Sequence, residues 1–327
     1  MTNHWQPSAS IATLKQRARF IGKIRQFFEL RDVMEVETPL LSQGTVTDVH
    51  LDAFVTEFLH HNSGDDKSLY LQTSPEFAMK RLLAAGSGPI FQICKAFRNE
   101  AAGRLHNPEF TMLEWYRPGF DEHALMTELD ALLQTLLSTP QAEKVSYQQA
   151  FLQCLNLDPL SIDLPSLKAF VAERSDDAWL QQESSKDTLL QWLFSLYVEP
   201  QLGAHGDTLV PCFVYDFPAS QSSLAKINQA NPKVAHRFEL YFNGMELANG
   251  FYELQDAKEQ ARRFKQDNQL RVQNGQAARP VDKRFLGALE AGLPDCAGVA
   301  VGVDRLFMLA SGKTQIHQVL SFGIENA

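Results

Sequence analysis

Hydrophobic residues recur every third or fourth position near the amino-terminal end of the chain. This spacing is that of one helix face, and basic residues occupy positions between them. The pattern predicts an amphipathic helix over residues 8–31, with Ser8 or Ser10 as the cap of its first turn. The apolar positions that carry the prediction are Ile11, Leu14, Ala18, Ile21 and Phe28.

Strand-like and helix-like segments follow up to residue 117. The segment DVMEVETPLLS indicates a short strand that Pro39 interrupts, and LDAFVTEF and SLYLQTS indicate further strands. The segment PEFAMKRLLAAG predicts a helix with Pro75 in its first turn and Gly86 past its end. Alternation over residues 90–117 predicts a β-hairpin.

Residues 121–200 are enriched in leucine, glutamine and serine, and they predict a mostly helical insertion or subdomain. Strand patterns return in CFVYDFP and HRFELYFNGMELANGFYEL, and AGVAVGVDRLFMLASG is typical of a strand that turns into a helix. The strands lack the strand–helix–strand rhythm of a parallel sheet. We therefore expect an α+β fold in which an antiparallel β-sheet is flanked by helices.

Composition narrows the class of protein. The net charge is −9 and the pI is about 5.5, so the chain lacks the overall basic footprint of a nucleic-acid binder. No apolar run reaches the roughly 18 residues of a membrane span, and the start MTNHWQPSAS is unlike a secretion signal. We expect a cytoplasmic protein. The cysteines lie far apart, which favours reduced thiols over disulfides or a zinc site: Cys94, Cys154, Cys212 and Cys296.

The dipeptide Asn243-Gly244 between two strand-like runs predicts a tight hairpin. Its register places Glu239, Tyr241 and Glu246 on one face, with the two carboxylates about 7–8 Å apart at the backbone. Oxygen ligands with open positions suit Mg²⁺. The alternative is a pair of solvated glutamates on an exposed strand. The register pairs Phe242 with Met245, Tyr241 with Glu246 and Leu240 with Leu247.

The segment FRNEAAGRLHNPEFTMLEWY, residues 97–116, is unusually rich in charge for a hairpin. Its return strand carries Phe110, Met112, Glu114 and Tyr116 on one face. On that face Phe110 is placed to stack on a base, and Glu114 and Tyr116 are placed to receive an ammonium group. Arg98 and Arg104 bracket the loop, where guanidinium groups suit phosphate oxygens. The alternative is a salt-bridged surface hairpin.

The segment AGVAVGVDRLFML is the third candidate site, and its residues suit phosphate binding. Its glycines permit close approach of a ligand to the backbone, and Arg305 in the following helix is placed to bind a terminal phosphate. The alternative is tight strand–helix packing with Asp304 and Arg305 as an ordinary ion pair. No glycine-rich phosphate loop is present, so a nucleotide would be held by side chains.

Taken together, these segments resemble the class II aminoacyl-tRNA synthetases over nearly the whole chain. DVMEVETPLL, FRNE…RLHNPEFTMLEWY and GVAVGVDRL are similar to motifs 1, 2 and 3 of that family, and TSPEFAMKRLL and ELANGFYEL are similar to its lysine-specific branch. The resemblance implies the catalytic fold of that family as a single domain over residues 1–327. It also implies the use of ATP with Mg²⁺, and a homodimer through the motif 1 helix and Pro39.

The resemblance further implies roles for individual residues, with Arg98 and Arg305 as the catalytic ones. Arg98 is expected on the α-phosphate of ATP, Arg305 on the γ-phosphate and Phe110 against adenine, while Glu239 and Glu246 hold Mg²⁺. The expected ATP contacts are Arg98, Asn99, Glu100, His106, Asn107, Phe110, Glu246, Leu247, Gly302 and Arg305. The expected amino-acid contacts are Ser74, Pro75, Glu76, Glu114, Tyr116, Asn249, Phe251, Glu253 and Ala300. Strict alternation places Asn249, Phe251 and Glu253 on the face opposite to Glu246, so a bulge at Gly250 is expected.

Two departures from the lysine-specific synthetases narrow the expected function. The motif 1 helix begins near residue 8, so no anticodon-binding OB domain is expected and tRNA is not an expected substrate. Ala300 stands where the pattern A-G-x-G-x-G-x-D-R has its middle glycine, and one methyl group shifts discrimination by about 1–3 kcal/mol. Both departures are similar to the stand-alone bacterial paralogues of lysyl-tRNA synthetase that modify elongation factor P.

That resemblance implies a two-step ligase. ATP activates (R)-β-lysine as an adenylate, and the ε-amine of a lysine on elongation factor P then takes the acyl group. The alternatives are a truncated lysyl-tRNA synthetase that charges tRNA and a non-catalytic regulatory or scaffold protein. Against the latter stand the retained charged residues, since burying charges without use is costly.

Overall fold

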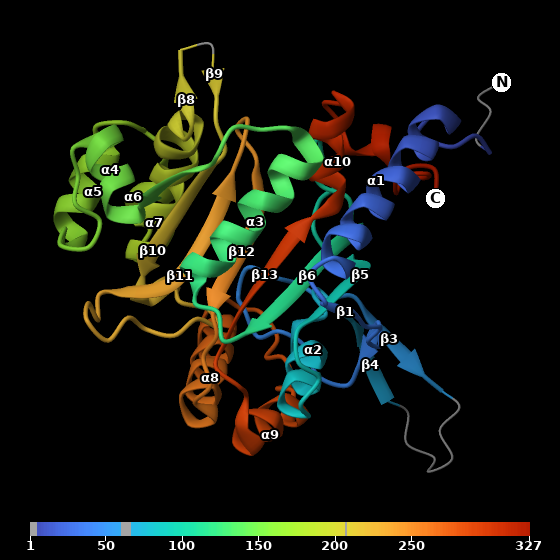
Figure 1. Cartoon of the computed structure of the whole chain (residues 1–327). Helices are drawn as coiled ribbons and strands as arrows, with labels where there is room; N and C mark the ends of the chain where they lie inside the picture. Colours follow the sequence, from blue (N-terminus) through green and yellow to red (C-terminus); the bar gives the residue numbers. More distant parts are fainter. Residues whose placement is uncertain (1–4, 60–66, 207) are drawn as a thin grey trace. The chain divides into compact units, whose positions relative to one another are not determined.

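The computed structural model describes residues 5–59, 67–206 and 208–327, and Figure 1 shows their helices and strands. The chain divides into two compact units. The first holds residues up to 121, residues 135–137 and residues from 253 onward, and the second holds residues 122–134 and 138–252. None of the helices in the described ranges is long and apolar enough to cross a membrane. The prediction that the start of the chain is not a secretion signal concerns in part residues 1–4, which lie outside those ranges.

The amino-terminal helix of the first unit, α1 (Ile11–Glu29), confirms the helix predicted over residues 8–31. Ser10 caps it, because its side chain accepts a hydrogen bond from the Thr13 backbone N–H at 3.1 Å. Its buried face includes Phe28, whose ring stacks on Phe91 at 4.5 Å and lies 5.2 Å from the ring of Trp115. The helix therefore covers the face of the sheet that carries Phe91 and Trp115.

In the first unit the hairpin predicted over residues 90–117 is confirmed, and it forms the centre of a sheet. The neighbours in order are β1 (Met34–Glu35), β5 (Ile90–Phe97), β6 (Glu109–Pro118) and β13 (Cys296–Gly302). The pairs β5–β6 and β6–β13 are antiparallel as expected, whereas β1 runs parallel to β5. A small separate sheet has the order β2 (Leu41–Ser42), β4 (Lys67–Leu71) and β3 (Val55–Phe58).

Three helices of the first unit pack together beside this sheet, at the lower edge of Figure 1. Pro75 is the cap of the first of them rather than a residue of its first turn, and Gly86 past its end has a φ of +88°. Phe77 and Phe285 join two of these helices by a stacked contact at 4.5 Å. The helices are α2 (Glu76–Ala84), α8 (Ala257–Gln273) and α9 (Lys283–Gly292), and after β13 the chain continues into α10 (Val303–Ser311) and η4 (Ile316–Val319).

The second unit joins a helical region to a second run of strands. Its helical part is α3 (Glu122–Leu137, to residue 134), α4 (Tyr147–Leu155), α5 (Leu164–Ala172), α6 (Ala178–Gln182), α7 (Lys186–Leu193), η1 (Phe194–Val198) and η2 (Glu199–Gln201). Its sheet has the order β12 (Glu246–Tyr252), β11 (Val234–Tyr241), β10 (Cys212–Pro218) and β7 (Glu143–Ser146). The expectation of a mostly helical region over 121–200 is confirmed, but β7 within it was not expected. The remaining elements are β8 (Ala204–His205), β9 (Thr208–Leu209) and η3 (Ala219–Gln221).

The core of the second unit explains why its helices fold against the sheet. Tyr147, Phe151 and Phe194 are fully buried and pack on one another and on Phe217 of β10. The strand β7 enters this core through Val145, and it pairs in parallel with β10. Because β7 is only four residues long and precedes a helix directly, its sequence has too short an alternation to be recognised.

The β11–β12 hairpin corrects the predicted register. The pairing of Phe242 with Met245 and of Tyr241 with Glu246 is confirmed, but Leu240 lies opposite Ala248 rather than Leu247. The extra residue is Leu247, so the bulge lies there and not at Gly250.

Gly250 has a different reason to be glycine. It lies opposite Phe238 in the ladder, and a Cβ at this position would lie 2.6 Å from Cε1 of that ring. The shifted bulge has the effect expected of it, because it moves Asn249 and Phe251 to the face of Glu239 and Glu246.

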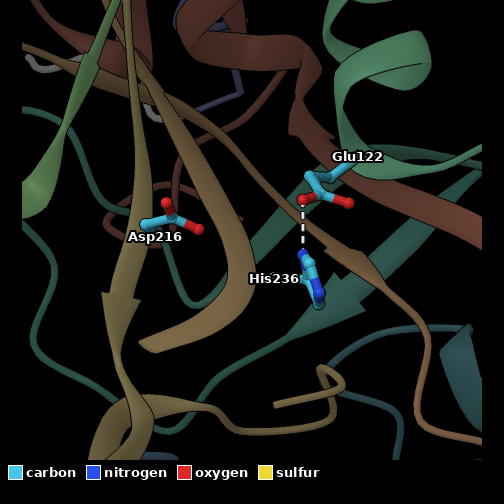
Figure 2. Close-up of side chains that lie close together, drawn as sticks. All are labelled: Glu122, Asp216 and His236. Atoms are coloured by element: carbon cyan, nitrogen blue, oxygen red, sulfur yellow. Dashed lines mark hydrogen bonds and ion pairs between the residues drawn. The ribbon is translucent and has the colours of Figure 1, made fainter. Parts of the chain in front are cut away.

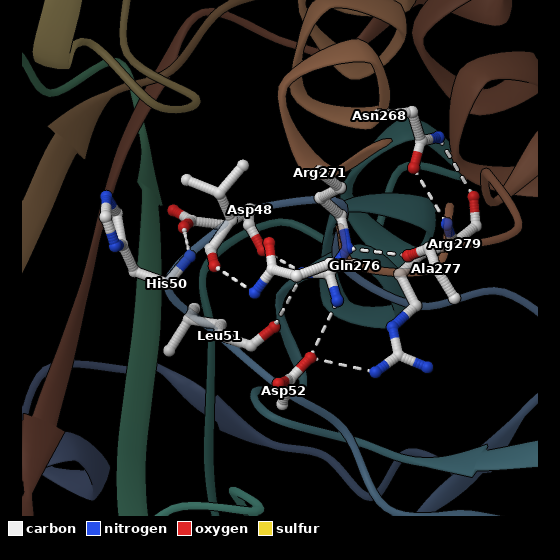
Figure 3. Close-up of polar contacts among 10 residues, drawn as sticks. Asp48, His50, Leu51, Asp52, Asn268, Arg271, Gln276, Ala277 and Arg279 are labelled. Atoms are coloured by element: carbon white, nitrogen blue, oxygen red, sulfur yellow. Dashed lines mark hydrogen bonds and ion pairs between the residues drawn. The ribbon is translucent and has the colours of Figure 1, made fainter. Parts of the chain in front are cut away.

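A buried arginine fastens the segment before β3 to the end of α8 (Figure 3). Arg271 is 1% exposed, and its guanidinium donates to the Ala277 carbonyl at 2.9 Å, the Asp48 carbonyl at 2.8 Å and Asp52 Oδ1 at 2.7 Å. The Asp52 carbonyl in turn accepts from the Asn99 backbone N–H at 2.8 Å. The network therefore supports the start of the charged loop between β5 and β6.

Replacing Arg271 with methionine is expected to lower the free energy of unfolding by about 2–4 kcal/mol, because it removes a buried donor from two backbone carbonyl groups and from Asp52. Urea denaturation followed by circular dichroism measures the loss. The control is Arg262→Met on the same helix, where the arginine is exposed and pairs with Glu259 at 2.7 Å. The control should leave the midpoint unchanged, and equal losses in both variants would contradict a role for the buried network.

Candidate active site

Three carboxylates gather in the first unit, and we call Glu76, Glu114 and Glu253 the acidic cluster. Glu76 begins α2, Glu114 lies in β6, and Glu253 follows β12 and is fixed by a hydrogen bond from its N–H to the Cys296 carbonyl at 3.0 Å. Lys80 lies one turn after Glu76, and its Nζ is 2.5 Å from Glu76 Oε1 and 2.6 Å from Glu253 Oε2. The three predicted carboxylates are therefore brought together, around a lysine that the sequence analysis did not identify.

Glu114 is held in place by two hydroxyl groups. Ser74 Oγ donates to its Oε1 at 2.5 Å and Tyr116 Oη donates to its Oε2 at 3.0 Å. Both contacts agree with the predicted placement of these three residues at one site. Burial raises the pKa of Glu114 to about 8, and the neighbouring charge of Glu76 adds to this effect. The carboxyl group therefore carries a proton over much of the neutral range unless a cation enters.

Glu253 is buried to the same degree. Burial raises the pKa of Glu253, and the ammonium of Lys80 opposes the effect. Its Oε1 has no hydrogen-bond partner among the described residues. A buried carboxylate oxygen without a partner is costly, so this atom is available to a donor from a ligand.

Strand β13 carries small residues beside the acidic cluster. In its register with β6, Gly298 lies opposite Tyr116, Ala300 opposite Glu114 and Gly302 opposite Met112. A Cβ on Gly298 would lie within the van der Waals surface of the Tyr116 ring and 2.6 Å from Glu253 Oε1. Gly298 therefore allows these two side chains to approach β13. The methyl group of Ala300 lies on the same face of the sheet as Glu114, which agrees with its predicted place at the amino-acid site.

Arg98 directly follows β5, and the N–H of its Nε is available to a ligand. Its guanidinium carbon is 5.2 Å from the centre of the Phe110 ring. Its Nε is buried and has no hydrogen-bond partner among the described residues. An orphaned guanidinium N–H beside an aromatic ring fits a phosphate group next to a stacked base. The two residues predicted to contact ATP are thus brought together.

Arg305 and His106 form a second predicted pair. Arg305 Nη2 lies 2.7 Å from His106 Nε2, and its Nε donates to the Leu105 carbonyl at 3.3 Å. Burial lowers the pKa of His106, and the charges of Arg305 and Arg98 lower it further, so the neutral ring accepts the hydrogen bond. Asp304, the chain neighbour of Arg305, is buried and pairs with Arg17 of α1 at 2.5 Å.

The other predicted ATP residues of the loop have structural partners or lie in solvent. Asn107 donates from its side chain to the Glu109 carbonyl at 2.6 Å and accepts from the Ile324 backbone N–H at 3.0 Å. Its side chain thereby ties the loop to the carboxyl-terminal segment. Asn99 and Glu100 are exposed. Arg104 is also exposed, and its contact is the Thr314 carbonyl at 3.4 Å.

In the second unit, β11 and β12 bring the predicted metal ligands to one face. Arg237 Nη2 donates to Glu239 Oε1 at 2.5 Å and its Nε donates to Asn249 Oδ1 at 3.1 Å, while Tyr241 Oη donates to Glu239 Oε2. Glu246 lies opposite Tyr241 on the same face. The donors that could ligate a metal are all oxygen, and Arg237 and Tyr241 fix the carboxylate of Glu239, so the residues fit a hard divalent cation. Leu247 and Phe251 are buried beside them.

A further group of possible metal ligands in the second unit was not predicted (Figure 2). Glu122, Asp216 and His236 each offer a ligand atom, all within 4.8 Å of one another. His236 Nδ1 lies 2.6 Å from Glu122 Oε1, and this hydrogen bond raises the pKa of His236. Protonation of the imidazole is therefore favoured, and it places a positive charge beside the carboxylates. The residues come from three separate segments, so the sequence contains no local signal for the group.

Known proteins resemble the chain over its full length. A family model described as tRNA synthetases class II (D, K and N) matches residues 4–326. A protein of Pseudoalteromonas translucida is 58% identical over 99% of both chains, and one of Vibrio cholerae is 55% identical over 100% of both. A protein of Proteus mirabilis is 55% identical over 99% of this chain and 98% of its own. Each of these relatives is named elongation factor P–(R)-β-lysine ligase.

Proposed function

The chain belongs to the class II tRNA synthetases of the D, K and N group, and on that premise we propose that it is an ATP-dependent ligase that attaches (R)-β-lysine to elongation factor P. The observation that carries the proposal is the full-length similarity to ligases of that name, at 53–58% identity. The acidic cluster supports it, because three carboxylates at one site suit a substrate with positively charged amino groups.

The proposed reaction has two steps. A carboxylate oxygen of (R)-β-lysine attacks the α-phosphorus of ATP, and pyrophosphate leaves with the electrons of the broken P–O bond. The ε-amine of a lysine on elongation factor P then attacks the acyl carbon, an amide bond forms, AMP leaves and the amine loses a proton. Catalysis rests on positioning and on neutralising charge, since the site offers no evident covalent nucleophile.

The arginines have distinct parts in this scheme. Arg98 binds the phosphate that is attacked, and Phe110 stacks on the adenine. Arg305 exchanges its hydrogen bond to His106 for one to the departing pyrophosphate. Both arginines act as catalytic residues because negative charge builds on these oxygens in the transition state. Glu239 and Glu246 would hold Mg²⁺, which when bound supplies positive charge to the phosphate oxygens.

The acidic cluster makes binding of the amino acid dependent on pH. Below about pH 8 Glu114 holds a proton that an incoming ammonium group must displace, so the affinity for (R)-β-lysine should rise by up to about tenfold per pH unit between pH 6 and 8. It should fall again once the substrate amines lose their protons. The charged and titratable groups that act on Glu114 are Glu76, Lys80, Glu253, Tyr116 and Cys94.

Isothermal titration calorimetry in two buffers of different ionisation enthalpy measures the protons released on binding. Proton release near neutral pH is the expected result. A dissociation constant that stays constant between pH 6 and 8, with no proton release, would contradict the assignment of the acidic cluster as the ammonium site.

Mass spectrometry of elongation factor P tests the proposed function most directly. The factor is incubated with this protein, ATP and each lysine isomer in turn. The expected result is a mass increase of one lysyl group on a lysine side chain, greatest with (R)-β-lysine. Efficient charging of tRNA with lysine in a parallel reaction would favour a truncated synthetase. No ATP–pyrophosphate exchange with any isomer would favour a non-catalytic protein. The proposed site of action is the cytoplasm, and tRNA is not among the proposed substrates.

A homodimer is part of the proposal. Several apolar side chains at the end of α1 and on strands β1 to β3 of the first unit are exposed, and β1 lies within the predicted motif 1. A second copy of the chain would cover them. Light scattering after size exclusion should give the mass of a dimer, and Met34→Asp with Val55→Asp should give a monomer. These side chains are Leu30, Met34, Leu41, Val55 and Phe58.

A further inference from the structure

Lys80 is a charged side chain with no contact to solvent. Both its side chain and that of Glu253 are 1% exposed. Its Nζ meets Glu76 Oε1 from its own helix at 2.5 Å and Glu253 Oε2 from a distant segment at 2.6 Å. The centre of the Phe285 ring lies 5.7 Å from Nζ. An ammonium group in such a place is stable only because the two carboxylates replace its hydration.

A purely structural role would require only the two carboxylates that contact Lys80, whereas the acidic cluster has three. The charge of Glu76 raises the pKa of Glu114, and the charges of Glu76 and Glu114 raise the pKa of Glu253. The three carboxylates therefore interact electrostatically. With all groups ionised, three carboxylates and one ammonium group leave two negative charges. (R)-β-lysine and lysine each carry two ammonium groups. The ammonium group of Lys80 therefore leaves the cluster with two negative charges, which the two ammonium groups of a diamino acid neutralise.

We propose that Lys80 is a positioning residue of the amino-acid site, an internal ammonium group that holds Glu76 and Glu253 in place by its ion pairs and limits the cluster to two further positive charges. The proposal rests on the proposed function and specifies its substrate class as amino acids with two ammonium groups. Glu253 is the link to the substrate, because its Oε2 faces Lys80 while its Oε1 has no partner among the described residues.

The charge state of Lys80 agrees with this role. Burial alone lowers the pKa of Lys80, but the carboxylates of Glu253 and Glu76 outweigh this effect and raise the pKa above its usual value. Lys80 therefore stays positive wherever the enzyme is folded and active. Without Lys80, the pKa of Glu253 would lose the effect that opposes burial, and a proton on Glu253 would compete with the substrate up to a higher pH.

Lys80→Met in the full chain tests the proposal. The dissociation constant for (R)-β-lysine at pH 7.5 is expected to rise at least about tenfold, equivalent to one unit of carboxyl pKa. The loss should shrink as the pH rises, so the plot of affinity against pH becomes steeper than that of the wild type. ATP binding should stay within about twofold, which shows that the fold is intact. If methionine is not tolerated, Lys80→Gln, which keeps two N–H donors, carries the same test.

Chemical rescue separates charge from packing. Adding ethylammonium to Lys80→Ala is expected to restore both the affinity for (R)-β-lysine and its pH dependence, whereas ethanol of similar size is not. The matched control is Lys95→Met, because Lys95 pairs with Glu109 at 3.2 Å on the surface of the same unit. That variant should bind the substrate like the wild type.

Two results would overturn the proposal. The first is a Lys80→Met or Lys80→Gln variant that binds (R)-β-lysine with the affinity and the pH dependence of the wild type. The second is an affinity lost to the same extent at every pH and not restored by ethylammonium, which would mark Lys80 as a packing residue. Failure of the wild type itself to bind either lysine isomer would instead count against the proposed function.

Discussion

Replacing Gly298 with alanine is expected to reduce (R)-β-lysine-dependent ATP–pyrophosphate exchange by at least about a hundredfold. The added methyl group would meet the Tyr116 ring and Glu253 Oε1, both inside contact distance. Neither can retreat easily, because Tyr116 donates to Glu114 and Glu253 is paired with Lys80. A displacement of about 1 Å of the groups that orient a substrate is enough for a loss of this size. Initial rates of exchange at saturating ATP measure it.

The control for this prediction is Gly287→Ala in α9. A Cβ at Gly287 meets nothing within 4 Å, and alanine favours a helix over glycine. This variant should keep full activity and unfold at the same or a slightly higher temperature. If Gly298→Ala also kept its activity, the approach of Tyr116 and Glu253 to β13 would not matter for the amino-acid site.

The sequence identifies the parts of the site that follow from local periodicity. The face that carries Phe110, Glu114 and Tyr116 required only the alternation of one strand, and the contact between Glu114 and Tyr116 confirms it. The Asn243-Gly244 turn likewise determined the first two pairs of its hairpin. These predictions succeed because a strand has a fixed period of two and a tight turn fixes its register.

What the sequence could not supply depends on contacts between distant segments. The bulge at Leu247 was placed at Gly250, because glycine is the usual local sign of a bulge. Nothing near Gly250 in the sequence reveals that its partner is the ring of Phe238. Leu247 is buried, and its burial depends on packing against segments that are distant in the sequence.

Lys80 was missed for a related reason. Its spacing of four residues from Glu76 is the usual signal of an exposed ion pair on a helix, worth only a few tenths of a kcal/mol. The sequence does not show that Glu253, 173 residues further along the chain, closes over the same ammonium group. Arg17 is a similar case, because its pairing with Asp304 joins α1 to α10, two helices that lie far apart in the sequence.

The two arginines of the charged loop allow a sharp test of phosphate binding. Arg98→Ala is expected to reduce ATP–pyrophosphate exchange by about a hundredfold to a thousandfold, because it removes the guanidinium group that we propose to bind the attacked phosphate, where negative charge develops. Its buried Nε without a partner and its place beside Phe110 support this assignment. Arg98→Lys should recover little activity, since an ammonium group cannot form two parallel hydrogen bonds to a phosphate. The KM for (R)-β-lysine should change far less than kcat.

Arg104→Ala is the matched control, because Arg104 belongs to the same loop, carries the same charge and is exposed, with a contact to the Thr314 carbonyl at 3.4 Å. If the loop acts only through its overall positive charge, both alanine variants should lose activity to a similar extent and high salt should weaken the wild type equally. If Arg98 binds the attacked phosphate directly, only its replacement abolishes exchange. Similar losses in the two variants would therefore contradict the role assigned to Arg98, and retained exchange in Arg98→Ala would remove it from the catalytic residues.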